Sequence, residues 1–336
     1  MRDDVIVALY TDDMAIFGRD DAAVEAFKTA LKEDQPGLID QLLTDVGLIN
    51  RVSDTDGEVA DDPKVKHVPA TAVLRSDPDD QPFDYPWNYR SVVGKLNYLA
   101  QNTRPDISFA VHQCARFVTA PTKKCGEAVK YLCRYLLQTR TKGIILTPTG
   151  ENRIDAHVDA DFCGLWSAKN AHKRESCLSR TGYSIRYAGC PILWSSKLQT
   201  EIALSTCEAE YIALSLCLRQ VIPLRRLLDE LAIFRPPTPH PTLTSFDNAE
   251  TVVLAKQMRS VVHEDNSGAL EIATTDSQNR PRTKHLSIKW HHFRDHVAAG
   301  TVEVRKIGTK EQQADIFTKP LHRPDFERLR LLLLGW

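Results

Sequence analysis

The sequence has few of the features that mark secreted or membrane-spanning proteins. Its eight cysteines form no Cys-x-x-Cys pair and no regular framework, so we expect reduced, mostly buried thiols. No uninterrupted apolar run approaches the roughly 20 residues that a membrane span needs. The first four residues, Met1 to Asp4, carry acids where a signal peptide needs bases. These absences predict an intracellular protein with no membrane partner.

The chain also lacks an excess of either charge. Its 336 residues carry a net charge of −1, which excludes binding to nucleic acid through a global electrostatic field. Any such binding must come from local basic faces. The length is sufficient for two domains with sizeable cores, and the hydrophobic fraction of 42% is ordinary for a globular protein.

A long amphipathic segment at residues 206–231 predicts a helix on which one acid needs an explanation. Apolar residues recur at helical spacing, and Ser205 or Thr206 supplies an N-cap oxygen. Glu208 lies in the first turn, where capping and the helix dipole explain it. Glu210 heads the apolar stripe, and a buried acid costs several kcal/mol unless it is paired or bound to a metal. A capping or solvated role for Glu210 stays open at this point.

The N-terminal part predicts a hairpin with acids at its tip. Apolar runs at 5–10 and 14–17 flank Thr11, Asp12 and Asp13, although an ordinary acidic turn would look the same. Helical patterns follow at 24–32 and 38–48. Residues 50–86 are polar and rich in Asp and Pro, which is typical of a linker.

The middle of the chain, residues 87–150, predicts a small helical segment. Helical spacing before and after a break at Pro105 indicates two helices, and 127–137 predicts a third. Lys130, Arg134 and Arg140 lie on the polar side of the third helix and just beyond it. Composition alone favours a simple solvated face for these bases.

The C-terminal part predicts an α/β fold, a mixed sheet with flanking helices. Strands are expected at 154–160, 181–187, 191–196, 261–265 and 301–307, and helices at 206–231, 267–273, 286–299 and from 310 onward. The first three strands would form an antiparallel meander, and the fourth would lie parallel beside the first. Acids at strand ends would then meet in one crevice. That crevice would join Asp159, Glu210, Asp265 and Asp315.

Several motifs resemble one known family. Tyr10-Thr11-Asp12-Asp13 resembles the YxDD signature of reverse transcriptases. The run from Tyr89 through Asp106, followed by Cys133-Arg134-Tyr135-Leu136, resembles the segment that joins polymerase to ribonuclease H in copia-type (Ty1/copia) retrotransposon Pol polyproteins. The resemblance covers nearly the whole chain. It implies a truncated reverse-transcriptase palm remnant at 1–49, a linker at 50–86, a connection segment at 87–150 and a ribonuclease H-like domain at 151–336.

The resemblance also implies an activity. Asp159, Glu210, Asp265 and Asp315 match the ribonuclease H quartet, which would hold two Mg²⁺ or Mn²⁺ ions and hydrolyse the RNA strand of an RNA–DNA hybrid. Asp12 and Asp13 would be metal ligands of the polymerase remnant. Polymerase activity is not expected, because only four residues precede the first strand. Other polyprotein parts would be partners, with a virus-like particle or the nucleus as location.

Some details depart from the family pattern or leave alternatives. Residues 305–309 hold no histidine before the last acid, and Asp247-Asn248 weakly echoes Asp265-Asn266, which suggests extra sequence at 245–261. His285, His291, His292 and His296 lack a further ligand at zinc spacing. The stretch from Thr283 to Phe293 also resembles the copia-type pattern, which implies phosphate contacts from Lys284 and Lys289. Two alternative functions stay open. One is a catalytically dead relic that at most binds nucleic acid, and the other is an integrase or transposase.

Overall fold

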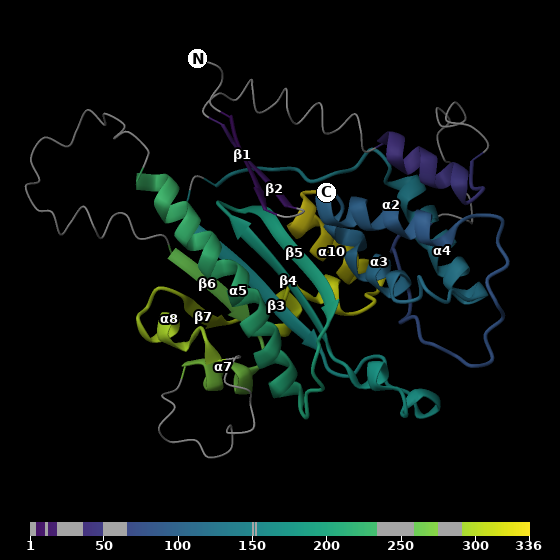
Figure 1. The fold of residues 1–336 in the computed structure, drawn as a ribbon. Helices are drawn as coiled ribbons and strands as arrows, with labels where there is room; N and C mark the ends of the chain where they lie inside the picture. Colours follow the sequence, from purple (N-terminus) through teal and green to yellow (C-terminus); the bar gives the residue numbers. More distant parts are fainter. Residues whose placement is uncertain are drawn as a thin grey trace, which may run out of the picture.

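A five-stranded mixed sheet forms the centre of the fold (Figure 1). The computed structural model describes residues 5–10, 13–18, 36–49, 66–149, 151, 153–233, 259–274 and 291–336. The sheet has the order β5-β4-β3-β6-β7. Its strands are β3 (Arg153–Asp161), β4 (Arg180–Tyr187), β5 (Cys190–Leu198), β6 (Arg259–Glu264) and β7 (Glu303–Lys306). Strands β3, β4 and β5 form an antiparallel meander, and β6 lies parallel to β3. The strand pairing predicted from the sequence is confirmed.

One face of the sheet packs against the long helix α5 (Thr206–Ile233). Alternation along β3 turns Ile154, Ala156 and Val158 toward this helix, where all three are fully buried. Helix α7 (Ser267–Thr274) joins the same layer. The apolar side chains of α5 that were predicted to face the sheet, among them Leu214 and Cys217, lie in this core.

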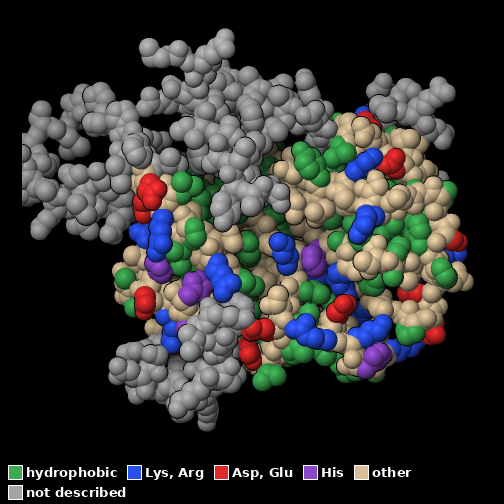
Figure 2. All heavy atoms as spheres, viewed as in Figure 1, with side chains coloured by type: hydrophobic (Ala, Val, Ile, Leu, Met, Phe, Trp, Pro, Cys, Tyr) green, Lys and Arg blue, Asp and Glu red, His purple; other side chains and the backbone are tan. Residues whose placement is uncertain are grey.

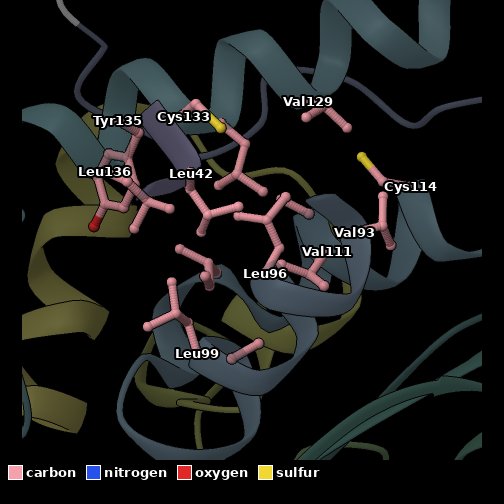
Figure 3. Close-up of a cluster of buried hydrophobic side chains, with 14 of the residues drawn as sticks. Leu42, Val93, Leu96, Leu99, Val111, Cys114, Val129, Cys133, Tyr135 and Leu136 are labelled. Atoms are coloured by element: carbon pink, nitrogen blue, oxygen red, sulfur yellow. The ribbon is translucent and has the colours of Figure 1, made fainter. Parts of the chain in front are cut away.

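The other face is covered by the helical segment and the C-terminal helices. These are α2 (Tyr89–Asn102), η2 (Pro105–Ile107), α3 (Ser108–Ala115), α4 (Lys123–Gln138), α9 (Asp315–Thr318) and α10 (Arg323–Leu334). Their shared core contains Leu42 from a helix at 36–45, Leu96 from α2 and Leu136 from α4 (Figure 3). Phe317 and Leu333 from the end of the chain lie in the same core. The four-part domain division stays a prediction.

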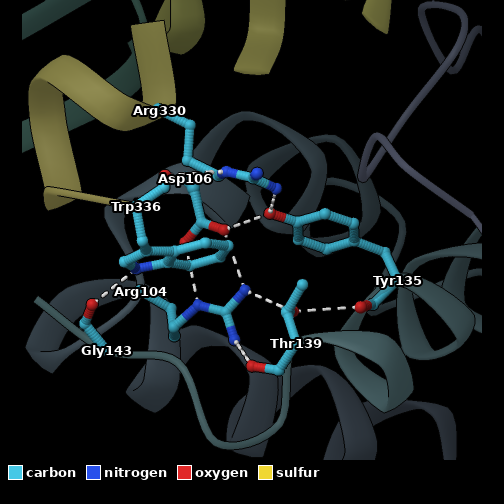
Figure 4. A network of polar contacts seen from close by, with 7 residues as sticks. All are labelled: Arg104, Asp106, Tyr135, Thr139, Gly143, Arg330 and Trp336. Atoms are coloured by element: carbon cyan, nitrogen blue, oxygen red, sulfur yellow. Dashed lines mark hydrogen bonds and ion pairs between the residues drawn. The ribbon is translucent and has the colours of Figure 1, made fainter. Parts of the chain in front are cut away.

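A buried polar network ties the helical segment to the last residues (Figure 4). Arg104 donates two hydrogen bonds to the carboxylate of Asp106, at 2.9 and 2.8 Å, and both side chains are fully buried. Tyr135 donates to the same carboxylate at 2.6 Å. The indole N–H of Trp336 donates to the carbonyl of Gly143 at 2.6 Å, and the guanidinium of Arg330 lies 4.1 Å from the Trp336 ring centre. Arg104 and Asp106, which carried the family resemblance, therefore have a structural role.

The N-terminal hairpin is present as a separate two-stranded sheet. Strand β1 (Val5–Tyr10) pairs antiparallel with β2 (Asp13–Gly18), which confirms the predicted hairpin. Asp12 at its tip lies outside the described residues, and so does the side chain of Asp13. The helix predicted at 24–32, most of the 245–261 segment, and Lys284 and Lys289 also lie outside them.

Two C-terminal helices differ from the expected ranges. In the described part of 286–299, the only α-helix is α8 (Arg294–Ala298). The residues before it contact α5 instead: Tyr211 and His291 are hydrogen-bonded at 2.7 Å, and Phe293 is fully buried. The region from 310 is divided into α9 and α10, because Pro320 disfavours a helical conformation at Lys319, which is extended at φ −142° and ψ 156°.

The surface carries both signs of charge. On the face in Figure 2, basic side chains are interspersed with acids and histidines. This agrees with the net charge of −1. Within the described ranges, no helix has the length and apolar character that crossing a membrane requires.

Candidate metal centre

Three carboxylates from different elements converge at the C-terminal ends of the inner strands β3 and β6. Asp159 lies near the end of β3, Glu210 lies in the first turns of α5, and Asp265 directly follows β6. One oxygen from each of the three lies within 4.8 Å of the others. Asp159 and Glu210 are buried, and Asp265 is partly exposed. Among the residues that the structure describes, this is the one such group of potential metal ligands.

The start of α5 explains why Glu210 and Glu208 differ. The Ser205 hydroxyl accepts a hydrogen bond from the Glu208 N–H at 3.1 Å, and the Glu208 carboxylate accepts one from the Leu204 N–H at 2.8 Å. This reciprocal capping occupies Glu208 at the helix start. Glu210 lies on the buried side of the helix, as its place on the apolar stripe predicted.

The loop that carries Asp265 is fixed by its neighbours. The Asn266 side chain accepts hydrogen bonds from the N–H groups of Gly268 and Ala269, at 2.9 and 3.0 Å, and so caps α7. The Asn266 N–H donates to the carboxylate of Glu264 at 2.9 Å. Asp265 is therefore held between a strand end and a capped helix.

A glycine lets the helix α9 approach Asp159. Gly182 on β4 is the register partner of Asp159. A Cβ at this position would lie 2.6 Å from Cγ2 of Thr318 and 2.7 Å from Cβ of Phe317. Because glycine leaves this space, the Thr318 hydroxyl reaches Asp159 and donates a short hydrogen bond to its Oδ2.

Three buried acids of the site, Glu210, Asp159 and Glu264, have raised pKa values. Burial, together with Glu264, Asp159 and Asp265, raises the pKa of Glu210 to about 11. Burial is also the main cause that raises the pKa of Asp159 and, well above its usual value, that of Glu264. One carboxylate oxygen of Glu210 and one of Glu264 are buried without a hydrogen-bond partner. Buried, unpaired acid oxygens in one place are what a bound cation would satisfy.

Asp315 lies beside this group but is paired with a lysine. Burial and the nearby Asp159 raise the pKa of Asp315 to about 7. The ammonium group of Lys319 lies 2.8 Å from Asp315 Oδ1 and 3.9 Å from Asp159 Oδ2. Asp315 is not a member of the three-acid group. The structure thus brings three of the four predicted acids together and places the fourth next to them.

Sequence reasoning missed Glu264, Thr318 and Lys319. Glu264 is two residues from Val262, so strand alternation turns both toward the α5 side, and Glu264 is fully buried there. Lys319 is one helical turn after Asp315, a spacing that allows an ion pair. These two signals were present in the sequence. The hydrogen bond from Thr318 depends on how α9 docks, which spacing does not give.

The histidines do not gather into a metal site in the described part of the chain. His291 is bonded to the Tyr211 hydroxyl at 2.7 Å, His292 to the Ser215 hydroxyl at 3.3 Å, and His296 to the Thr301 hydroxyl at 3.2 Å. The expected phosphate contacts from Lys284 and Lys289 stay predictions.

Comparison with known proteins identifies the family. The chain is 35% identical, over 246 residues, to the retrovirus-related Pol polyprotein from transposon TNT 1-94 of Nicotiana tabacum, a match covering 73% of this chain and 16% of that protein. It is 33% identical, over 244 residues, to the Pol polyprotein from transposon RE1 of Arabidopsis thaliana, with 72% and 14% covered. The chain belongs to the copia-type retrotransposon Pol polyproteins.

This Pol-family chain therefore spans about one sixth of the length of these curated relatives. It is also 37% identical over 127 residues to the secreted RxLR effector protein 161 of Plasmopara viticola, a match that covers 38% of the chain and 84% of that protein. No family model matches the chain, and no solved structure matches it significantly.

Proposed function

We propose that this chain is a retroelement-derived ribonuclease H that hydrolyses the RNA strand of RNA–DNA hybrids with Mg²⁺ or Mn²⁺. The observation that carries the proposal is that one carboxylate oxygen from each of Asp159, Glu210 and Asp265 lies within 4.8 Å of the others. Oxygen-only ligands suit a hard divalent cation. The hairpin β1–β2 is then the remnant of a reverse-transcriptase palm.

The sheet supports a ribonuclease H-like fold. Three antiparallel strands are followed by a helix and then by a strand parallel to the first. Asp159 lies on the first strand, Glu210 on the helix after the meander and Asp265 directly after the fourth strand, which is the chain order of the first three acids of the family's quartet. Membership in the copia-type Pol polyproteins gives independent support, since the relatives are named as Pol polyproteins.

The donor set fits a metal ion, because it combines carboxylates with buried oxygens that lack partners. Asp159, Glu210 and Asp265 would hold the ion. Asp315 lies beside them, and burial together with the nearby Asp159 raises the pKa of Asp315. A bound Mg²⁺ would supply Lewis acidity and an activated water. The Thr318 hydroxyl orients Asp159, and the capped loop after Glu264 orients Asp265.

The hybrid would be recognised through its backbone and its 2′-hydroxyl groups rather than by sequence. The interspersed charges argue for contacts limited to local basic groups. We therefore expect binding to weaken with rising salt by less than it does for strongly basic nucleic-acid-binding domains.

The decisive experiment incubates the chain with an RNA–DNA hybrid labelled on its RNA strand, with Mg²⁺ and with EDTA. We expect RNA cleavage only with Mg²⁺, and none of single-stranded RNA. The Asp265→Asn variant should lose cleavage while keeping its circular dichroism spectrum, because it is nearly isosteric but lacks the charge that binds the ion. Metal-independent cleavage, or full activity of Asp265→Asn, would contradict the proposal, and a folded chain with no cleavage would favour the relic alternative.

A further inference from the structure

Lys319 brings a positive charge into the candidate metal centre. Its ammonium nitrogen lies 2.8 Å from Asp315 Oδ1 and 3.9 Å from Asp159 Oδ2. The Lys319 side chain is 38% exposed, whereas those of Asp315 and Asp159 are 14% and 5% exposed. The ammonium group therefore lies at the mouth of the site, in contact with two partly or fully buried carboxylates.

The backbone around Lys319 makes this position specific. Pro320 restricts Lys319 to an extended conformation, which ends α9 after a single turn. The preceding residue, Thr318, is bonded to Asp159, so the chain is fixed on both sides of the lysine. A freely rotating surface lysine would lack both constraints.

The charges of the site are unevenly distributed between two places. Asp159, Glu210 and Asp265 form one compact group of oxygens. Asp315 lies outside that group, and its carboxylate is paired with Lys319. Among the described residues, the Lys319 ammonium group is closer to the second place, at 2.8 Å from Asp315 Oδ1, than to the first, where it is 3.9 Å from Asp159 Oδ2.

We propose that the Lys319 ammonium group occupies the place, between Asp159 and Asp315, that a second metal ion would take. The inference rests on the proposed function. The first divalent ion binds at the preformed three-acid group. A second ion binds only when the tethered ammonium withdraws, so the protein discriminates between one-ion and two-ion states.

The test measures Mn²⁺ binding by calorimetry on the full chain without nucleic acid, together with thermal melting in EDTA. We expect Lys319→Gln to tighten the second Mn²⁺ by about tenfold, equivalent to ~1.4 kcal/mol. The same variant should lower the metal-free melting temperature, because the acids lose a cation. Lys319→Arg keeps the charge and should bind Mn²⁺ as the unaltered chain does. Lys310→Gln, at an exposed lysine in the short 3₁₀ helix Thr309–Glu311 before Asp315, is the matched control and should change neither measurement.

The possible failures are distinguishable. An unaltered chain that binds no Mn²⁺ contradicts the proposed function, and the inference falls with it. If one ion binds but Lys319→Gln leaves both the second ion and the metal-free melting temperature unchanged, the inference alone is wrong. A Lys319→Arg variant that admits the second ion as readily as Lys319→Gln also overturns it, since charge would then be irrelevant.

Discussion

At the scale of single residues, Glu208 and Glu210 show how far sequence periodicity reaches. They lie two positions apart on one helix, which turns their side chains in nearly opposite directions. Capping chemistry explains Glu208, and the apolar stripe places Glu210 inside. The same kind of argument was available for Glu264 from strand alternation. It went unused because Asp265, one residue later, matched the family motif.

Exchanging each of these two acids for its amide should give opposite results. Glu210→Gln should remove Mg²⁺-dependent hybrid cleavage, because it removes a buried charged ligand. Glu208→Gln should keep cleavage and lower the free energy of unfolding by at most about 1 kcal/mol, since it only weakens the helix start. Hybrid cleavage and thermal melting of both variants check this. Loss of cleavage in Glu208→Gln alone would show that the wrong acid was chosen.

Metal removal should make stability depend on pH in a defined direction. The pKa of Glu210 is raised to about 11, above its unfolded value, so the native state keeps a proton that the unfolded state releases. Stability therefore falls as pH rises above the unfolded pKa, by up to about 1.4 kcal/mol per pH unit. Between pH 7 and 8, histidines with lowered pKa values no longer oppose this trend.

Urea unfolding in EDTA at pH 7 and pH 8 measures the effect. The free energy of unfolding should be lower at pH 8, and saturating Mg²⁺ should reduce the difference because it stabilises the ionised acids. The Glu210→Gln variant serves as control and should show a smaller pH slope. A metal-free chain that is more stable at pH 8 would contradict the expectation.

At the scale of elements, α9 is the part that sequence patterns described least well. Periodicity predicted a helical region from residue 310, and the position of Asp315 followed from the family motif. The single-turn length of α9 follows from Pro320, which could have been used. The close docking of α9 on β4 could not be predicted, because it depends on a missing side chain at Gly182 and on tertiary packing.

Filling the space at Gly182 should displace α9. In Gly182→Ala, the new methyl group would meet Thr318 and Phe317 at distances that require movement. We expect a loss of about 1–3 kcal/mol of stability and weaker Mn²⁺ binding, because Asp159 loses its hydroxyl partner. Gly94→Ala in α2 is the matched control, because a Cβ added at this position would meet nothing within 4 Å. This variant should be neutral or stabilising. Equal melting temperatures for both variants would count against the docking argument.

At the scale of the whole molecule, the helical segment and the C-terminal helices act as one packed body on the sheet. Their common core contains side chains from 36–46, 92–136 and 316–334. The sequence predicted the helices of the segment as a separate unit, and local periodicity cannot reveal which distant helix completes a core. The buried Arg104–Asp106 pair lies at this junction.

Breaking that pair should unfold the junction. Among the described residues, Arg104→Met leaves Tyr135 as the remaining side-chain donor to the buried carboxylate of Asp106, which should cost about 3–5 kcal/mol. Arg90→Met, at an exposed position of α2, is the control and should change stability by less than about 0.5 kcal/mol. Denaturant unfolding curves compare the two. A similar small effect in both would show that the network is dispensable.

The shared core joins residues that are synthesised far apart in time. The helices that pack around Leu96 leave the ribosome before Phe317 and Leu333, which close the same core, are synthesised. Until then the apolar faces of the early helices stay uncovered, and such surfaces invite aggregation or chaperone binding. The residues that close the core follow Asp315 directly or within a few turns. Translation that stops before Asp315 therefore yields a chain that lacks this acid and part of the shared core, and its uncovered apolar faces favour aggregation.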